Sequence, residues 1–214
     1  TCDNYLLTNS NAVESDFNLL TFDDNTGWNT HNGYDSVWQS FMWKRHSGFD
    51  TVTYTGNGTA GHQIPHSLNK IPEMIWVKRR DSAAIWRVYH KSLNGGSSPE
   101  GYNIILNQDV VEASDTTTWN NSAPTSTHFN LGTHVGTNGD DNRFLAMLFS
   151  SVSGISKVGY YDGSSSDVTI TTDFQPRFVI IKAMTIAYPW MVLDSVRGWG
   201  TSDDSGDDPY LRLN

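Results

Sequence analysis

The sequence has little of three things that many functional classes need: cysteine, charge and long apolar runs. Only one of its 214 residues is a cysteine, Cys2, so the chain cannot form an internal disulfide or a multi-cysteine metal site. Charged residues make up 17% of the chain, against about 25% in typical soluble domains. No window approaches the roughly 18 uninterrupted apolar residues of a membrane span. Stability is therefore expected to come from packing and from partner chains.

Positive charge is also scarce. The chain has 14 Lys plus Arg against 23 Asp plus Glu, a formal charge of -9. A phosphate backbone would be repelled on average, which argues against nucleic-acid binding. The basic run Lys78–Arg80 is followed at once by Asp81 and ends an apolar stretch. We interpret it as a solvated strand end.

Aromatic residues, in contrast, are abundant at 12% of the chain, which excludes a disordered chain. Surface polarity must come from Ser, Thr, Asn and Gly, a profile typical of β-rich extracellular or virion-surface proteins. The sequence starts without Met or a signal-like apolar segment, so we expect it to begin after a cut.

Two long stretches of the sequence match each other. Ile71–Lys78 aligns with Gln175–Lys182 at a separation of 104 positions, and Trp86 falls on Trp190 at the same separation. Further upstream the separation is 106, which indicates a small deletion; the matched pairs there are Gly48 with Gly154, Val52 with Val158 and Tyr54 with Tyr160. The sequence therefore predicts a tandem repeat of about 105 residues.

The chain ends fit the same scheme. Asn4–Glu14 resembles Tyr102–Glu112, 98 positions later, and Tyr210–Asn214 resembles the start of that motif again. We expect residues 1–48 to be the C-terminal part of a preceding repeat, 49–154 a complete repeat, and 155–214 the N-terminal part of the next. The alternative is two modules closed by strand exchange between the chain ends.

Apolar alternation with a period of two predicts many short strands. Val37–Trp43 alternates, while its counterpart Phe144–Phe149 is apolar on both faces, as in a strand covered on both sides. Turn sequences such as Gly56–Gly58 and Asn138–Asp140 punctuate the strands. The pattern predicts an all-β fold of β-sandwich or jelly-roll-like modules. Further strands are expected near 4–8, 16–22, 49–55, 73–79, 84–90, 102–107, 127–132, 155–161, 167–172, 177–183, 189–194 and 209–213.

No catalytic motif is present. There is no G-x-S-x-G nucleophile turn, and Gly56–Gly61 lacks the Lys-Ser/Thr ending of a phosphate loop. Paired carboxylates for glycoside cleavage cannot be identified, because nearly every acid lies in a hydrophilic stretch. We therefore expect no enzyme activity, no catalytic residues and no cofactor-binding residues.

Metal-ligand patterns are weak. His62 and His66 are four apart, but Pro65 rules out the helical arrangement, so we expect no zinc site. Calcium is the one cofactor for which oxygen ligands are available, although no acidic stretch has the spacing of the known calcium loop. These stretches are Asp23-Asp24-Asn25, Asp140-Asp141-Asn142, Asp203-Asp204 and Asp207-Asp208.

The repeat sorts the aromatic residues into two groups. Positions that are apolar in both copies, such as Trp86 with Trp190, most simply serve the core or the packing between copies. Aromatics without a partner lie in polar surroundings, where exposed rings stack on sugars or, in the alternative reading, cap a hydrophobic edge. The candidate glycan contacts are Trp28, Tyr34, Trp119, Tyr188 and Trp199.

Several motifs together resemble a known family. They are Tyr54–Gly61, Pro72–Arg80, Trp86–Leu93 and Trp119–Thr125, and the second copy repeats the pattern at Phe174–Lys182. They resemble the tandem-repeat module of large tail-fibre and other virion structural proteins of marine tailed phages, notably those that infect cyanobacteria. The second copy departs by having Ala183 where the first has Arg79, which makes a shared function of the basic run doubtful.

The resemblance implies an elongated virion appendage that reaches towards the host surface. It implies a homo-oligomer, commonly a trimer in fibres, with other virion proteins and host-surface glycans as partners. It carries no catalytic or ligand residues over to this chain. Two other hypotheses remain open: a carbohydrate-binding module of a secreted protein, and a depolymerase domain.

Overall fold

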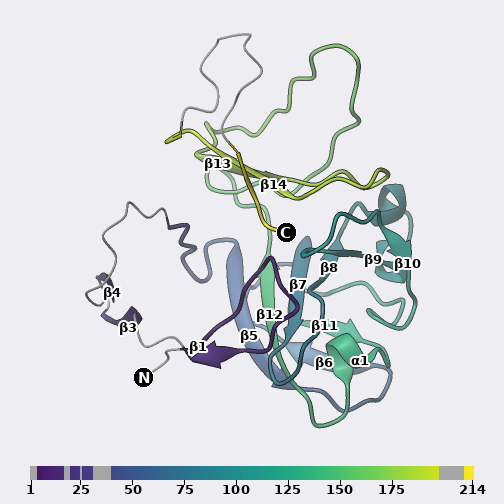
Figure 1. Cartoon of the computed structure of the whole chain (residues 1–214). Helices are drawn as coiled ribbons and strands as arrows, with labels where there is room; N and C mark the ends of the chain where they lie inside the picture. Colours follow the sequence, from purple (N-terminus) through teal and green to yellow (C-terminus); the bar gives the residue numbers. More distant parts are fainter. Residues whose placement is uncertain (1–3, 17–19, 25, 31–39, 198–209) are drawn as a thin grey trace.

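The computed structural model describes residues 4–16, 20–24, 26–30, 40–197 and 210–214. Its largest element is a six-stranded antiparallel sheet in the order β10-β9-β8-β7-β12-β5, which lies at the centre of Figure 1. The all-β prediction is confirmed. The strands of this sheet are β5 (Phe49–Thr55), β7 (Met74–Arg79), β8 (Arg87–His90), β9 (Tyr102–Ile105), β10 (Ala113–Ser114) and β12 (Arg143–Phe149).

A second, two-stranded sheet forms the other layer of a β-sandwich. It pairs β6 (His62–Pro65) with β11 (His128–Leu131). Ile64 and Phe129 from this sheet join Phe144 and Leu148 of β12 in one buried cluster. The ring of Tyr54 from β5 stacks on Phe144 with centroids 5.1 Å apart and an interplanar angle of 16°. Aromatic and branched residues from both layers thus make the core.

β12 is the central strand of the packing, and its two faces are both covered, as its sequence predicts. Phe144, Ala146 and Leu148 are fully buried against the second layer. Leu145 and Met147 are partly buried, and with Leu6 they line a pocket on the opposite face. Figure 1 shows the segment of β1 (Asn4–Tyr5) crossing in front of β5 and β12. The N-terminal segment therefore covers the second face of the sheet.

In the part of the chain that the structure describes, helical structure is confined to single turns. They are η1 (Leu93–Gly96), η2 (Pro99–Gly101) and α1 (Val135–Asn138). None of the helical turns in the described ranges has the length and apolarity needed to cross a bilayer.

Three small sheets lie outside the sandwich. β1 pairs with β2 (Ser15–Asp16), and β3 (Leu20–Asp24) pairs with β4 (Gly27–Thr30). A three-stranded sheet contains β13 (Phe178–Ile181), β14 (Met191–Asp194) and β15 (Tyr210–Arg212), and Figure 1 shows it beyond one end of the large sheet.

The registers of two of these small sheets repeat those of the large one. Phe178 pairs with Asp194 as Met74 pairs with His90. Every paired residue of β13–β14 lies 104 positions after the corresponding residue of β7–β8. β1 pairs with β2 as β9 pairs with β10, 98 positions later. The central strands thus recur with the same register, while a repeat of the whole 105-residue unit stays a prediction.

Two predicted strands of the second copy do not form. Residues 155–161 and 167–172 are in no strand, apart from an isolated bridge between Val152 and Ser156. In the first copy the counterpart of 155–161 is β5, which pairs only with β12. Among the described residues, no strand of the β12 type lies beside 155–161. The strand predictions at 155–161 and 167–172 are therefore wrong.

Candidate functional site

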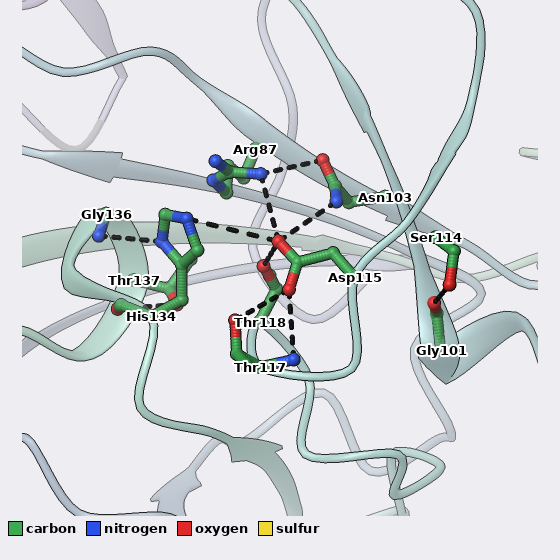
Figure 2. Close-up of polar contacts among 10 residues, drawn as sticks. All are labelled: Arg87, Gly101, Asn103, Ser114, Asp115, Thr117, Thr118, His134, Gly136 and Thr137. Atoms are coloured by element: carbon green, nitrogen blue, oxygen red, sulfur yellow. Dashed lines mark hydrogen bonds and ion pairs between the residues drawn. The ribbon is translucent and has the colours of Figure 1, made fainter.

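A polar cluster of the sandwich surrounds Asp115, and Figure 2 shows it. Four segments bring it together: β8 supplies Arg87, β9 supplies Asn103, the loop after β10 supplies Asp115, and α1 is capped by His134. Thr118 in the same loop is fully buried. We call this set the Asp115 cluster and define it by Arg87, Asn103, Asp115, Thr117, Thr118 and His134.

Both oxygens of the Asp115 carboxylate are occupied. Oδ2 accepts hydrogen bonds from Thr118 Oγ1 at 2.7 Å and from Arg87 Nη1 and Asn103 Nδ2, each at 3.3 Å. Oδ1 accepts from the backbone N–H and the hydroxyl of Thr117 at 2.9 and 2.7 Å. Burial alone would raise the pKa of Asp115, but these hydrogen bonds outweigh it and hold the pKa below its ordinary value.

His134 has no ring nitrogen available as a general base. Its Nδ1 accepts a hydrogen bond from the backbone N–H of Gly136 at 2.9 Å, which caps α1. Its Nε2 lies 3.9 Å from Asp115 Oδ2. Burial, and then the charge of Arg87, lower the pKa of His134, which favours the neutral ring. This arrangement ties α1 to the loop after β10 and offers no proton acceptor to a substrate.

Removing the Asp115 carboxylate tests this structural assignment. The Arg87 side chain is 13% exposed and its Nε already lacks a partner. Asp115→Ala would leave this cation without its carboxylate, so we expect the free energy of unfolding to fall by about 2–3 kcal/mol. Urea unfolding measures it, with Asp167→Ala in an exposed stretch as the control. A change within about 0.5 kcal/mol would contradict the assignment.

A second cluster centres on the buried carboxylate of Asp50, at the start of β5. It accepts hydrogen bonds from Arg45 Nε at 2.5 Å and Thr51 N at 2.9 Å, and from the backbone N–H and hydroxyl of Ser67 at 2.7 and 3.0 Å. Arg45 is 55% exposed, so the ion pair itself contributes little. Burial would raise the pKa of Asp50, but the bonds from Arg45, Ser67 and Thr51 lower it overall.

The lowered pKa of Asp50 predicts acid sensitivity. Because the folded pKa lies below the ordinary value of 3.8, the carboxylate contributes stability above about pH 4 and loses it as the pH falls through the folded pKa. We expect Asp50→Asn to lower the melting temperature at pH 6, with a difference from the wild type that shrinks below pH 4. Thermal unfolding between pH 6 and 2.5 measures this, with exposed Asp162→Asn as the control. A pH-independent difference would contradict it.

Asn138, at the end of α1, is a third buried polar centre. Its Nδ2 donates to the carbonyl oxygens of Gly132 and Thr59 and to Asn57 Oδ1, at 2.7, 2.9 and 3.2 Å. Its Oδ1 contacts His62 Nδ1 at 2.8 Å and accepts from Asn57 N at 3.1 Å. Every hydrogen-bonding group of this amide is used to hold the turn between β5 and β6 against α1.

The predicted glycan contacts differ in how exposed their rings are. Tyr188 is 48% exposed, as predicted. Trp119 is only 2% exposed and packs edge-to-face on Tyr89 at 5.9 Å, so the expected exposed ring is wrong there. Trp28 lies in β4, but its side chain falls outside the described part of the structure, as do Tyr34 and Trp199 altogether. The described residues do not bring these aromatics together into one surface.

The residues considered as metal ligands make other contacts. His62 contacts Asn138, and His66 Nε2 lies 3.2 Å from the carbonyl oxygen of Thr125. Of the acidic stretches, Asp203-Asp204 and Asp207-Asp208 lie outside the described residues, and Asn142 accepts from Arg79 Nη2 at 2.7 Å. Within the described ranges no three His, Cys, Asp or Glu residues gather as a metal site.

The basic run corrects another expectation. Lys78 is fully buried, so the interpretation as a solvated strand end is wrong for this residue. Its Nζ donates to the carbonyl oxygens of Arg79 at 2.9 Å and Asn11 at 3.4 Å. Burial, and then the nearby Arg79, lower the pKa of Lys78. Arg80 pairs with Glu14 at 2.9 Å. The run therefore fastens the N-terminal segment to the large sheet.

Two tryptophans fasten successive segments of the chain in the same way. Trp86, 1% exposed, donates its indole N–H to the carbonyl oxygen of Leu7 at 2.8 Å. Trp190, 5% exposed, donates to the carbonyl oxygen of Ile105, also at 2.8 Å. The two donors are 104 positions apart and the two acceptors 98, the same separations as in the sequence repeat. We call these contacts the first and second tryptophan junctions.

The backbone around the tryptophan junctions recurs as well. The backbone N–H of each tryptophan donates to an asparagine Oδ1, and its backbone carbonyl accepts from a leucine N–H. In each junction a glutamate backbone N–H also donates to a carbonyl oxygen two residues after Lys78 or Lys182. In the first these are Asn107 (3.0 Å), Leu106 (3.2 Å) and Glu14 to Arg80 (2.9 Å); in the second, Asn214 (2.8 Å), Leu213 (3.2 Å) and Glu112 to Met184 (3.0 Å).

The comparisons with known proteins give one family. Residues 21–205 match the family described as "Domain of unknown function (DUF7483)". The chain belongs to this family. Neither the curated proteins nor the solved structures gave a match. The DUF7483 match spans both tryptophans and the whole sandwich, so the features described above are those of a member of this family.

Proposed function

We propose that this chain is a non-enzymatic structural segment of a phage virion, part of a tail fibre or similar appendage that contributes to attachment to the host surface. The observation that carries the proposal is the recurrence of the tryptophan junction. At Trp86 and again at Trp190, the indole N–H donates to a backbone carbonyl oxygen of the preceding unit. A contact that recurs along a chain is what a tandem array requires, because each unit buries a face against its neighbour.

The junctions favour a stiff connection. Trp190 belongs to the same buried cluster as Trp76 of β7, and their rings lie 6.4 Å apart in an edge-on arrangement. Ile105, which accepts the indole bond, is itself part of β9 in the large sheet. The hydrophobic core therefore continues from one unit into the next. Such continuity suits an elongated appendage.

The polar clusters support a structural role in the same way. The Asp115 carboxylate, the Asp50 carboxylate and the Asn138 amide are all occupied by hydrogen bonds from the fold itself. Active sites keep reactive groups available to a substrate, whereas these groups hold loops and strands together.

Attachment would come from exposed rings that are repeated along the array. Tyr161 and Tyr188 are 46% and 48% exposed in the second copy. Aromatic faces of this kind stack on sugars, and weak single contacts add up when several copies act together. In this proposal the chain is located in the virion, and its partners are further copies of itself, as in a trimeric fibre, other virion proteins, and host-surface glycans.

Immunogold electron microscopy tests the proposal directly. Antibodies raised against the folded chain are applied to purified phage particles from a culture that produces it. We expect gold on a tail appendage, at a constant distance from the capsid. Antigen found only in the particle-free supernatant would contradict the virion assignment.

A carbohydrate-binding module of a secreted protein is the second candidate, and the exposed ring of Tyr188 favours it. This candidate predicts that the isolated monomer binds a glycan array and that Tyr188→Ala weakens the binding at least about tenfold, as the loss of a stacking contact would. Ile186→Ala, in the same segment and 61% exposed, is the matched control. Equal binding by both variants would contradict it.

A further inference from the structure

The sheet of β13, β14 and β15 is an incomplete copy of the large sheet. β15 pairs with β14 as β9 pairs with β8: Met191 lies opposite Arg212 where Arg87 lies opposite Ile105. In the large sheet, however, β7 lies between β8 and β12. Among the described residues β13 has β14 on one side and no strand on the other. The strand that is missing is the counterpart of β12.

The missing strand leaves apolar residues of β13 partly exposed. Ile75, Trp76 and Val77 of β7 are 1%, 3% and 0% exposed, whereas all four residues of β13, from Phe178 to Ile181, are only partly buried. An edge strand of this kind presents unpaired N–H and C=O groups, and natural edges are commonly blocked by a charge or a proline. β13 has neither within its length.

The same absence explains the exposed segment 155–161. Its counterpart β5 pairs with β12 alone, and Tyr54 of β5 stacks on Phe144 of β12. Tyr160, the counterpart of Tyr54, is 66% exposed and lies in no strand. A single added strand of the β12 type would therefore pair with β13 on one side and give 155–161 a partner on the other.

We propose that the free edge of β13 accepts a β12-type strand from a further repeat of this kind, in antiparallel register. The register follows from β7 and β12, where Met74 lies opposite Phe149 and Val77 opposite Ala146. On β13 the position of Phe149 would lie opposite Phe178, and the position of Ala146 opposite Ile181. The proposal rests on the tandem-array part of the proposed function and not on its place in the virion.

A contact already present supports this choice of occupant. Trp43 lies 106 positions before Phe149 and so belongs to the chain's other β12-type sequence. The centroid of the Trp43 ring lies 5.8 Å from that of the Phe178 ring, and the centroid of the Phe41 ring lies 5.4 Å from that of Phe178. Residues 40–43 form no strand there. Phe178, at the start of β13, thus already contacts Trp43, which corresponds to the position that the predicted register places opposite Phe178.

A register-specific disulfide tests the proposal. The chain carries Cys2→Ser and Ile181→Cys. The probe is a peptide of residues 142–151 with added terminal lysines. In the matched peptide, Ala146→Cys places a cysteine opposite the one introduced at position 181 in the predicted register. Directly opposed residues have Cα atoms near enough for a disulfide. The control peptide carries Phe149→Cys instead, three residues or about 10 Å along the strand. We expect cross-linking with the matched peptide at least about tenfold faster than with the control.

Hydrogen exchange on the unmodified chain gives an independent measurement. We expect the unmodified peptide to slow exchange of the β13 amides about tenfold or more, and a scrambled peptide of the same composition to leave them unchanged. Equal cross-linking by both cysteine peptides, no protection of β13, or full protection before any peptide is added would each overturn the proposal. Immunogold labelling is unaffected by these results, so a failure here and a failure of the virion assignment are distinguishable.

Discussion

Replacing Trp86 with alanine is expected to lower the free energy of unfolding by about 3–5 kcal/mol, the range for large aromatic-to-alanine changes in a core. The side chain is 1% exposed, and its indole N–H is bonded to Leu7. The substitution therefore removes core volume and leaves the Leu7 carbonyl without its donor. Urea unfolding followed by tryptophan fluorescence and by circular dichroism measures the loss.

Two further variants separate the effects at Trp86. Trp86→Phe keeps an aromatic ring but removes the N–H, so we expect a smaller loss of about 1–2 kcal/mol. Tyr161→Ala, at a position 46% exposed, is the control and should change stability by less than about 0.5 kcal/mol. If Trp86→Ala cost no more than this control, the first tryptophan junction would have no structural role.

Asn138→Ala is expected to cost about 3 kcal/mol. The amide is fully buried, and its removal leaves the Gly132 and Thr59 carbonyl oxygens and the Asn57 N–H without this partner. Buried polar groups that lose their partners cost about 1–3 kcal/mol each, and partial access of water to the turn reduces the total. Urea unfolding measures the change.

The control for Asn138 is Gln108→Ala, which removes an amide from an exposed position. Hydrogen exchange adds a local measurement, because Gly58 N–H donates to the Asn138 backbone carbonyl. We expect this amide to exchange faster in Asn138→Ala and not in Gln108→Ala. Unchanged exchange in both variants, with unchanged stability, would mean that the turn holds its shape without the amide.

The main strands of the sandwich could be predicted from the sequence because each is either an alternating or a continuous apolar stretch bounded by turn residues. β5, β7 and β12 were expected at 49–55, 73–79 and 144–149 and lie there. β6 was not predicted, because Ile64 is the one buried residue in His62–Pro65 and four residues show no alternation. The strand at 155–161 was predicted wrongly, since alternation does not reveal whether a pairing partner exists.

The polar clusters could not be predicted, because their contacts span long distances in the sequence. Asn138 binds Asn57 and Thr59, about 80 positions earlier. Trp119 is surrounded in sequence by Thr, Asn and Ser, which suggested an exposed ring, yet it is buried against Tyr89 from β8. Only the tryptophan junctions had a sequence signal, since their donors and acceptors recur at the repeat separations.

The position of Trp190 has a mechanical consequence. This residue comes from the second copy, but it is buried in the hydrophobic cluster of the first. A pulling force that detaches β14 would have to withdraw Trp190 from that cluster and break its bond to Ile105. Adjacent units would then share tension instead of rupturing one at a time, so a filament built this way would extend little before it fails.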